Sequence, residues 1–157
     1  MFGGMTKMYP DAPHKNSLKL GEEYQEIIRR NVLEQYKFKI EFYTNKKDQY
    51  EIGESKQRIE IKLDSQLKKY GHLSIEIAEK SRIEIQVWTA SGIFRNDNTK
   101  WYIQGDYQTA WVFLKNDLKE YYKNNNPRIH EYNGTIRKFY IDISVADKLA
   151  IRKVIIK

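Results

Sequence analysis

The strongest structural signal in the chain lies at residues 53–64, which read GESKQRIEIKLD. Apolar and charged residues alternate from 59 to 64, and successive side chains of a β-strand point to opposite faces of a sheet. The two isoleucines and the leucine would face a core, while Glu60, Lys62 and Asp64 project together from the other face. Glu54, at the preceding bend, can turn its carboxylate toward the same point. The segment therefore predicts a strand that carries a compact charged cluster.

Two carboxylates beside a lysine have a defined chemical use. Magnesium and manganese prefer oxygen ligands, and a bound ion polarises a phosphoryl oxygen and lowers the pKa of its water. A nearby ammonium group can orient the attacking water and offset charge that develops on the phosphate. The cluster thus favours phosphodiester hydrolysis. The alternative is a surface strand whose alternating charges form a solvated face.

The flanking sequence predicts one α/β domain. Residues 18–36 carry apolar side chains at helical spacing, with Glu22, Glu23 and Glu26 in the expected first turns. Period-two patterns predict strands at 38–42, 58–64, 74–78, 82–87 and 138–143. We expect a second helix over 106–123 with Asp106 as N-cap, a short helix from 144, and an edge strand at 154–156. Residues 1–17 indicate an irregular N-terminal arm, and residues 18–157 a single domain.

The composition favours an anionic partner. The 157 residues include 28 Lys plus Arg and 21 Asp plus Glu, which gives a formal charge of +7. A surplus of this size is typical of nucleic-acid-binding proteins, with an acidic membrane surface as the second partner class. The chain has no cysteine, which excludes disulfides and zinc–thiolate sites and fits a cytoplasmic protein. No segment has the length and hydrophobicity of a membrane span or the pattern of an export signal.

The segment around Glu60-Ile61-Lys62 resembles the PD-(D/E)xK, or restriction-endonuclease-like, phosphodiesterase superfamily. In that family an acidic residue precedes an acidic-x-Lys pair on a strand, and Glu54 takes the first position, where the family more often has Asp. The resemblance covers roughly residues 18–143. It implies a mixed β-sheet flanked by helices, in the order helix, β-meander, helix, strand. It also implies that Glu54 and Glu60 bind Mg²⁺ or Mn²⁺ while Lys62 assists the attacking water.

Further residues are supporting candidates. The segments at 74–80, 91–93 and 105–107 resemble those of small phage-encoded nucleases of this superfamily. Glu76 is expected on the strand next to Glu60, either as a ligand or as the cross-strand partner of a basic side chain. Glu23 is a candidate because some superfamily members add a first-helix Glu to the metal shell. Basic and aromatic residues also occur together at Lys68, Lys69, Tyr70, Arg95, Lys100, Trp101 and Tyr102. They suit contact with the phosphates and bases of a nucleic acid. The alternative is that they belong to solvated loops with a tryptophan in the core.

These observations predict a Mg²⁺- or Mn²⁺-dependent deoxyribonuclease. The alternative is a non-catalytic nucleic-acid-binding or phage accessory protein on the same scaffold, and a third hypothesis is a basic module that binds membrane surfaces or proteins. The sequence does not determine the sequence specificity, the endo- or exonuclease mode, or whether the substrate is DNA or RNA. A homodimer is also possible, since many such enzymes cut two strands as dimers. Lys62, as a strand lysine on an exposed face, is expected to contribute little to stability.

Overall fold

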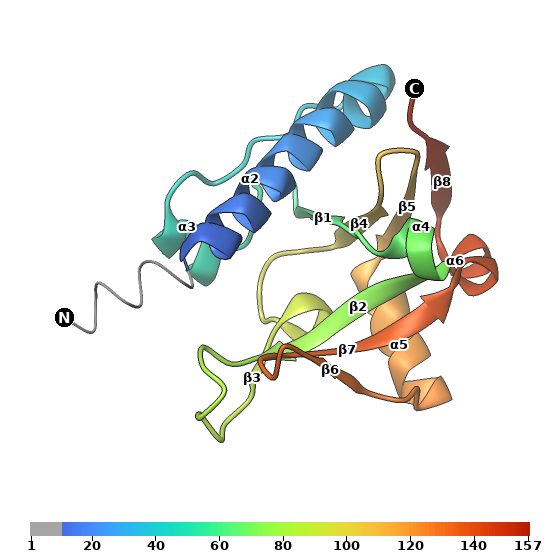
Figure 1. Ribbon diagram of the computed structural model, residues 1–157. Coiled ribbons are helices and arrows are strands. Elements are labelled where there is room, and N and C mark those ends of the chain that lie inside the picture. Colours follow the sequence, from blue (N-terminus) through green and yellow to red (C-terminus); the bar gives the residue numbers. More distant parts are fainter. Residues whose placement is uncertain (1–10) are drawn as a thin grey trace.

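The computed structural model describes residues 11–157, with side chains from residue 18 onward except residue 36 (Figure 1). These residues form five α-helices and two four-stranded β-sheets, which confirms a mixed α/β class. No described helix has the length and apolar character to cross a membrane. The helices are α2 (Asp11–Ile28), α3 (Lys46–Glu51), α4 (Leu67–Tyr70), α5 (Lys115–Asn125) and α6 (Ile143–Leu149).

The helix α2 continues without a break into one π-helical turn, Arg29–Leu33, and one 3₁₀ turn, Glu34–Tyr36. It begins at Asp11, so the expected irregular arm is wrong from that residue on, while residues 1–10 lie outside the described part. Glu22, Glu23 and Glu26 consequently lie well inside the helix rather than in its first turns. Glu26 forms ion pairs with Arg29 and Arg30 instead of complementing the N-terminal helix dipole.

The first sheet has the strand order β1-β4-β5-β8. Its strands are β1 (Ile59–Leu63), β4 (Trp101–Gly105), β5 (Thr109–Leu114) and β8 (Arg152–Ile155). The pair β1–β4 is parallel and the other pairs are antiparallel, so this sheet is mixed; the β-meander that the resemblance implied around the motif is wrong, because β1 pairs with β4 and the next strand, β2, belongs to the second sheet. The strand at 58–64 is therefore confirmed, but it lies at an edge of its sheet.

The second sheet has the order β3-β2-β7-β6 and is antiparallel throughout. Its strands are β2 (His72–Glu79), β3 (Thr89–Ala90), β6 (His130–Tyr132) and β7 (Ile136–Asp142). The strands expected at 74–78 and 138–143 are present, the second ending at Asp142. Because β1 and β2 belong to different sheets, the expectation that Glu76 lies on the strand next to Glu60 is wrong.

The two faces of the first sheet belong to two hydrophobic cores. Tyr24 and Ile28 of α2 pack with Ile59, Ile61 and Ile103 on one face. The other face meets the inner face of the second sheet, through a core that includes Tyr102, Trp111, Phe113, Leu73, Ile75 and Phe139. Figure 1 shows this layering, with α2 on one side of β1 and β4 and with β2, β7 and β6 on the other. Glu60 and Lys62, on the face of β1 opposite Ile59 and Ile61, therefore project toward the side of the second sheet.

The helix expected over 106–123 is wrong for its first half. Residues 109–114 form β5, whose two faces are both buried, with Ala110 in one core and Trp111 in the other. A strand buried on both faces lacks the alternation that identifies a half-buried strand, and its apolar residues also fit a helical stripe. Asp106 is not an N-cap, because its Oδ1 accepts hydrogen bonds from the backbone N–H groups of Gln108 and Thr109 in the β4–β5 turn.

Two further strand predictions are wrong. The segment 38–42 makes only an isolated bridge between Phe42 and Ser55. The segment 82–87 has no strand structure, and Ile83 and Val87 are 66% and 74% exposed. The alternation there reflects local composition, because the available edge of β2 pairs with the short strand β3 instead. The predicted C-terminal helix and edge strand are present as α6 and β8.

Candidate active site

A cleft of about 800 Å³ lies beside the polar face of β1. Its lining residues come from α2 and α3, from the loops before and after β1, and from strands β1, β2, β4, β6 and β7. The charged and polar residues of its walls include Glu22, Gln25, Gln49, Glu54, Glu60, Lys62, Asp64, Ser74, Glu76, Gln104 and Lys138. Four of the five predicted site residues therefore lie in one cleft.

Glu60 and Lys62 form the centre of the site. Because they alternate on β1, both side chains leave the same face, and Lys62 Nζ lies 3.3 Å from Glu60 Oε1. Glu60 is only 2% exposed, and its Oε2 atom has no hydrogen-bond partner among the described residues. A buried carboxylate oxygen without a partner is costly, and it suits a site that is completed by a ligand.

Burial and neighbouring charges perturb both groups. Burial raises the pKa of Glu60; Lys62 works against this rise, and the carboxylates of Glu54 and Asp97 add to it. Glu60, in turn, raises the pKa of Lys62, so the ammonium group stays charged at neutral pH. With 39% of its side chain exposed, Lys62 can carry that charge to a ligand in the cleft. Because Lys62 pairs with the buried Glu60, we expect it to contribute to the stability of the fold, unlike the exposed strand lysine that the sequence indicated.

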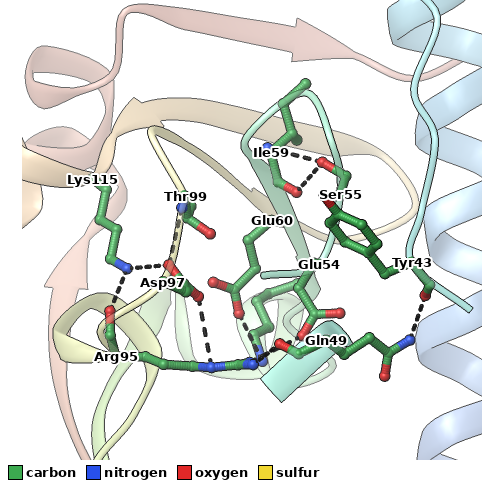
Figure 2. A network of polar contacts seen from close by, with 11 residues as sticks. Tyr43, Gln49, Glu54, Ser55, Ile59, Glu60, Arg95, Asp97, Thr99 and Lys115 are labelled. Carbon is green, nitrogen blue, oxygen red and sulfur yellow. Dashed lines mark hydrogen bonds and ion pairs between the residues drawn. The ribbon is translucent and has the colours of Figure 1, made fainter. Parts of the chain in front are cut away.

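Glu54 approaches Glu60 from the loop before β1. Figure 2 shows the two carboxylates close together, above the extended side chain of Arg95. Arg95 Nη1 donates to Glu54 Oε1 at 3.3 Å, and its Nη2 donates to the backbone carbonyl of Gln49. The arginine thereby fixes the loop and orients Glu54, so the two predicted metal ligands do converge.

Asp97 is a third carboxylate that the sequence analysis did not identify. Its Oδ1 accepts from Lys115 Nζ at 2.7 Å and from Thr99 N at 3.0 Å, and Oδ2 lies 3.7 Å from Arg95 Nε (Figure 2). Burial works to raise the pKa of Asp97, but the hydrogen bonds from Lys115 and Thr99 outweigh it, so the pKa lies below its ordinary value. The Asp-x-Thr sequence, typical of an Asx turn, was the available signal.

Glu76 and Glu23 have different outcomes. Glu76 lines the cleft from β2, directly opposite Lys138 in the register with β7, yet it makes no ion pair within 4 Å among the described residues. Its charge still contributes to the raised pKa of Lys62. Glu23 is exposed and is not part of the cleft wall; Glu22 and Gln25 of the same helix are. Whether a residue of α2 lines the cleft therefore depends on which side of the helix it occupies, and Glu23 lies on a side that the cleft does not include.

Asp64 joins three strands at the end of the cleft. Its Oδ2 accepts from the backbone N–H of Ser74 at 2.7 Å and from Gln104 Nε2 at 2.9 Å. Gln104 also donates to the Ser74 carbonyl at 2.7 Å. These bonds connect the end of β1 with β4 in the first sheet and with β2 in the second sheet. Asp64, the second acidic residue of the predicted strand face, therefore has a structural role.

Within the described part of the chain, no group of three or more His, Cys, Asp or Glu side chains is arranged to hold a metal ion. Comparison of the chain with protein families, curated proteins and solved structures gave no match. The functional assignment therefore depends on the chemistry of the cleft. Glu54 and Glu60 are the two carboxylates that suit a hard cation, since Mg²⁺ commonly takes one or two carboxylates and keeps several waters.

Proposed function

We propose that the protein is a metal-dependent nuclease of the restriction-endonuclease-like type that hydrolyses DNA phosphodiester bonds. One observation carries the proposal: a buried glutamate, a charged lysine on the same strand face and a second glutamate converge in a cleft beside a mixed sheet. The helix that precedes this sheet and packs on its other face agrees with the implied arrangement.

The unsatisfied oxygen of Glu60 supports the cation in this proposal. Glu54 and Glu60 would hold Mg²⁺ or Mn²⁺, with Glu60 contributing the Oε2 atom that has no hydrogen-bond partner among the described residues. The bound ion would polarise the phosphodiester and lower the pKa of a water molecule. Lys62 keeps a positive charge at the cleft, where it orients the attacking water and stabilises the charge that develops on the phosphate. Arg95 keeps Glu54 in position.

Positive charge next to the acidic site supports a polyanionic substrate. Asp97, whose charge helps to raise the pKa of Glu60, also lines a second cavity of about 350 Å³. Five basic side chains line it, against the one acidic side chain of Asp97: Arg58, Arg95, Lys100, Lys115 and Lys119. A nuclease needs such a neighbourhood, because it holds phosphates beside a cluster of carboxylates.

The second candidate function is a non-catalytic nucleic-acid-binding protein, such as a phage accessory protein. The lack of a three-residue metal-binding group among the described residues favours it. Both candidates predict binding to nucleic acid that weakens as salt rises. Only the nuclease predicts cleavage that requires a divalent cation and depends on Glu60 and Lys62.

A cleavage assay tests the proposal. Supercoiled, linear duplex and single-stranded DNA, with RNA as a fourth substrate, are incubated with the protein in Mg²⁺, Mn²⁺ or EDTA. We expect hydrolysis of at least one substrate with a metal and none in EDTA. Protein that binds these substrates and cuts none of them with either metal would support the binding protein and overturn the nuclease.

A further inference from the structure

The outer face of the second sheet carries a row of aromatic rings. The register of β2, β7 and β6 places Ser74 opposite Tyr140, and His130 opposite Lys138. Because side chains alternate along each strand, these residues lie on the face away from Leu73, Ile75 and Phe139, which form the inner core. The rings are Tyr70, His72, Tyr140, His130 and Tyr132, and we refer to them as the ring row.

Four rings of the row, from Tyr70 to His130, each lie within stacking distance of the next, whereas Tyr132 is connected to them through Lys138. The ring centroids of Tyr70 and His72 are 5.7 Å apart with an interplanar angle of 9°. His72 and Tyr140 are 4.0 Å apart, and Tyr140 and His130 are 4.4 Å apart. Tyr70 at one end is 55% exposed. An exposed, laterally supported tyrosine offers a rigid apolar surface that costs little side-chain entropy to use.

The row leads into the candidate active site. Lys138 Nζ lies 4.4 Å from the ring centroid of Tyr132 and 5.6 Å from that of Tyr140. Tyr132 is 47% exposed, and both Tyr132 and Lys138 are part of the wall of the cleft that contains Glu60 and Lys62. A ligand that lies along the ring row would therefore reach the carboxylates without leaving the protein surface.

Lysine side chains lie at both ends of the row, Lys69 at Tyr70 and Lys138 at Tyr132. Lys68 and Lys69 are exposed on α4, and Lys69 Nζ lies 5.2 Å from the ring centroid of Tyr70. Burial, together with Arg128, His72 and Lys138, lowers the pKa of His130, so this imidazole is neutral at pH 7. The register places three acidic residues on the same face: Glu76, within the cleft, Glu79, opposite Ile136, and Asp142, opposite His72. Rings interspersed with cations suit a ligand with flat groups on an anionic backbone.

We propose that the ring row binds single-stranded nucleic acid, with bases stacked on its tyrosines and the backbone passing Lys138 into the cleft. Bases in a duplex are paired and stacked on each other, so their faces cannot reach such rings, whereas unpaired bases can. This inference gives the substrate class of the nuclease proposed above and rests on that proposal for the cleavage step alone.

Binding in EDTA tests the inference without cleavage. Fluorescence anisotropy is measured with a labelled oligothymidylate and with a blunt duplex of the same length, using the wild type, Tyr132→Ala, Tyr132→Phe and Tyr70→Ala. Tyr107→Ala is the matched control, since Tyr107 is 46% exposed but lies in the β4–β5 turn, outside the cleft wall. Urea unfolding of each variant verifies that it is folded.

We expect the wild type to prefer the single strand. Tyr132→Ala and Tyr70→Ala should each weaken that binding by at least about 5-fold, the lower end of the effect of losing one stacked base. Tyr132→Phe, which keeps the ring, and Tyr107→Ala should bind like the wild type. Equal or tighter wild-type binding of the duplex would overturn the inference, as would alanine variants with unchanged single-strand affinity.

The outcomes also separate this inference from the proposed nuclease. If the alanine variants lose single-strand binding and the wild type cuts no substrate, the ring row stands and the nuclease fails. If the wild type cuts DNA with Mg²⁺ while both alanine variants bind and cut as it does, the nuclease stands and the ring row fails. An alanine variant that does not fold is replaced by its leucine counterpart, which retains most of the side-chain volume but has no aromatic ring for a base to stack on.

Discussion

Replacing Lys115 by Met should destabilise the protein strongly at neutral pH. Lys115 Nζ donates to Asp97 Oδ1 at 2.7 Å and to the Arg95 carbonyl at 2.8 Å, and the side chains of Lys115 and Asp97 are 4% and 0% exposed. Methionine preserves most of the volume but leaves the Asp97 carboxylate buried beside one cation, Arg95, at 3.7 Å. Removing one partner of a buried ion pair costs about 3–5 kcal/mol, a large part of the stability of a domain.

The double variant Lys115→Met/Asp97→Asn separates the pair from the rest of the site. It removes the unpaired charge, so its loss in free energy of unfolding should be smaller than the sum of the two single losses by about 1–3 kcal/mol. The pH dependence gives a second check. The pKa of Asp97 is lowered in the fold, so the pair contributes stability above the ordinary pKa of an Asp and loses it as pH falls through the folded value.

Urea unfolding at pH 7 and at a series of pH values that extends below the ordinary pKa of an Asp, about 4, measures these differences. The deficit of Lys115→Met relative to the wild type should be largest at pH 7 and should shrink as the pH falls through the acidic range. A stabilising buried pair of Lys115 and Asp97 is refuted if the single variant loses less than about 1 kcal/mol of free energy of unfolding at pH 7. It is also refuted if the losses of the two single variants add up to that of the double variant.

Three other variants test the site. Glu60→Gln should abolish metal-dependent cutting while affinity for nucleic acid, measured by anisotropy, holds or rises, because a negative charge facing the phosphates is gone; weaker binding would argue against its place in the cleft. Lys62→Ala should lower the cleavage rate by at least ~100-fold in a single-turnover assay, and unchanged cleavage would indicate a contaminating nuclease. It should also lower stability in urea, because buried Glu60 loses its cation. Gly92→Ala should cost about 2–4 kcal/mol, since Gly92 has φ +55° and an added Cβ would lie 2.1 Å from the Glu76 carbonyl oxygen; a loss below about 1 kcal/mol in urea unfolding would contradict that contact.

The sequence predicted β1 because one of its faces is buried and the other is polar. That alternation also identified Glu60 and Lys62 as neighbours, and in the structure Lys62 Nζ lies 3.3 Å from Glu60 Oε1. The strand β5 has two buried faces, so its apolar residues fitted a helix equally well. Residues 82–87 alternate as a strand does, but alternation cannot show whether a sheet edge is free to pair with them.

The rest of the site depends on contacts between distant segments. Arg95 and Asp97 reach Glu54 and the surroundings of Glu60 from a loop about 40 residues further along the chain. No local period reveals such convergence. Glu23 failed as a candidate for a different reason: whether a helical glutamate faces a cleft depends on the rotation of the helix about its axis, which the apolar stripe fixed only approximately.

The most direct test of the account is Mn²⁺ binding, followed by electron paramagnetic resonance of the free ion. The wild type should bind Mn²⁺ at a site that Glu60→Gln loses, and Glu54→Gln should weaken it. Glu120→Gln, an exposed carboxylate on α5, is the matched control and should bind as the wild type does. Wild-type protein that binds no Mn²⁺, or Glu60→Gln protein that binds it as tightly as the wild type, would contradict a metal site at Glu54 and Glu60.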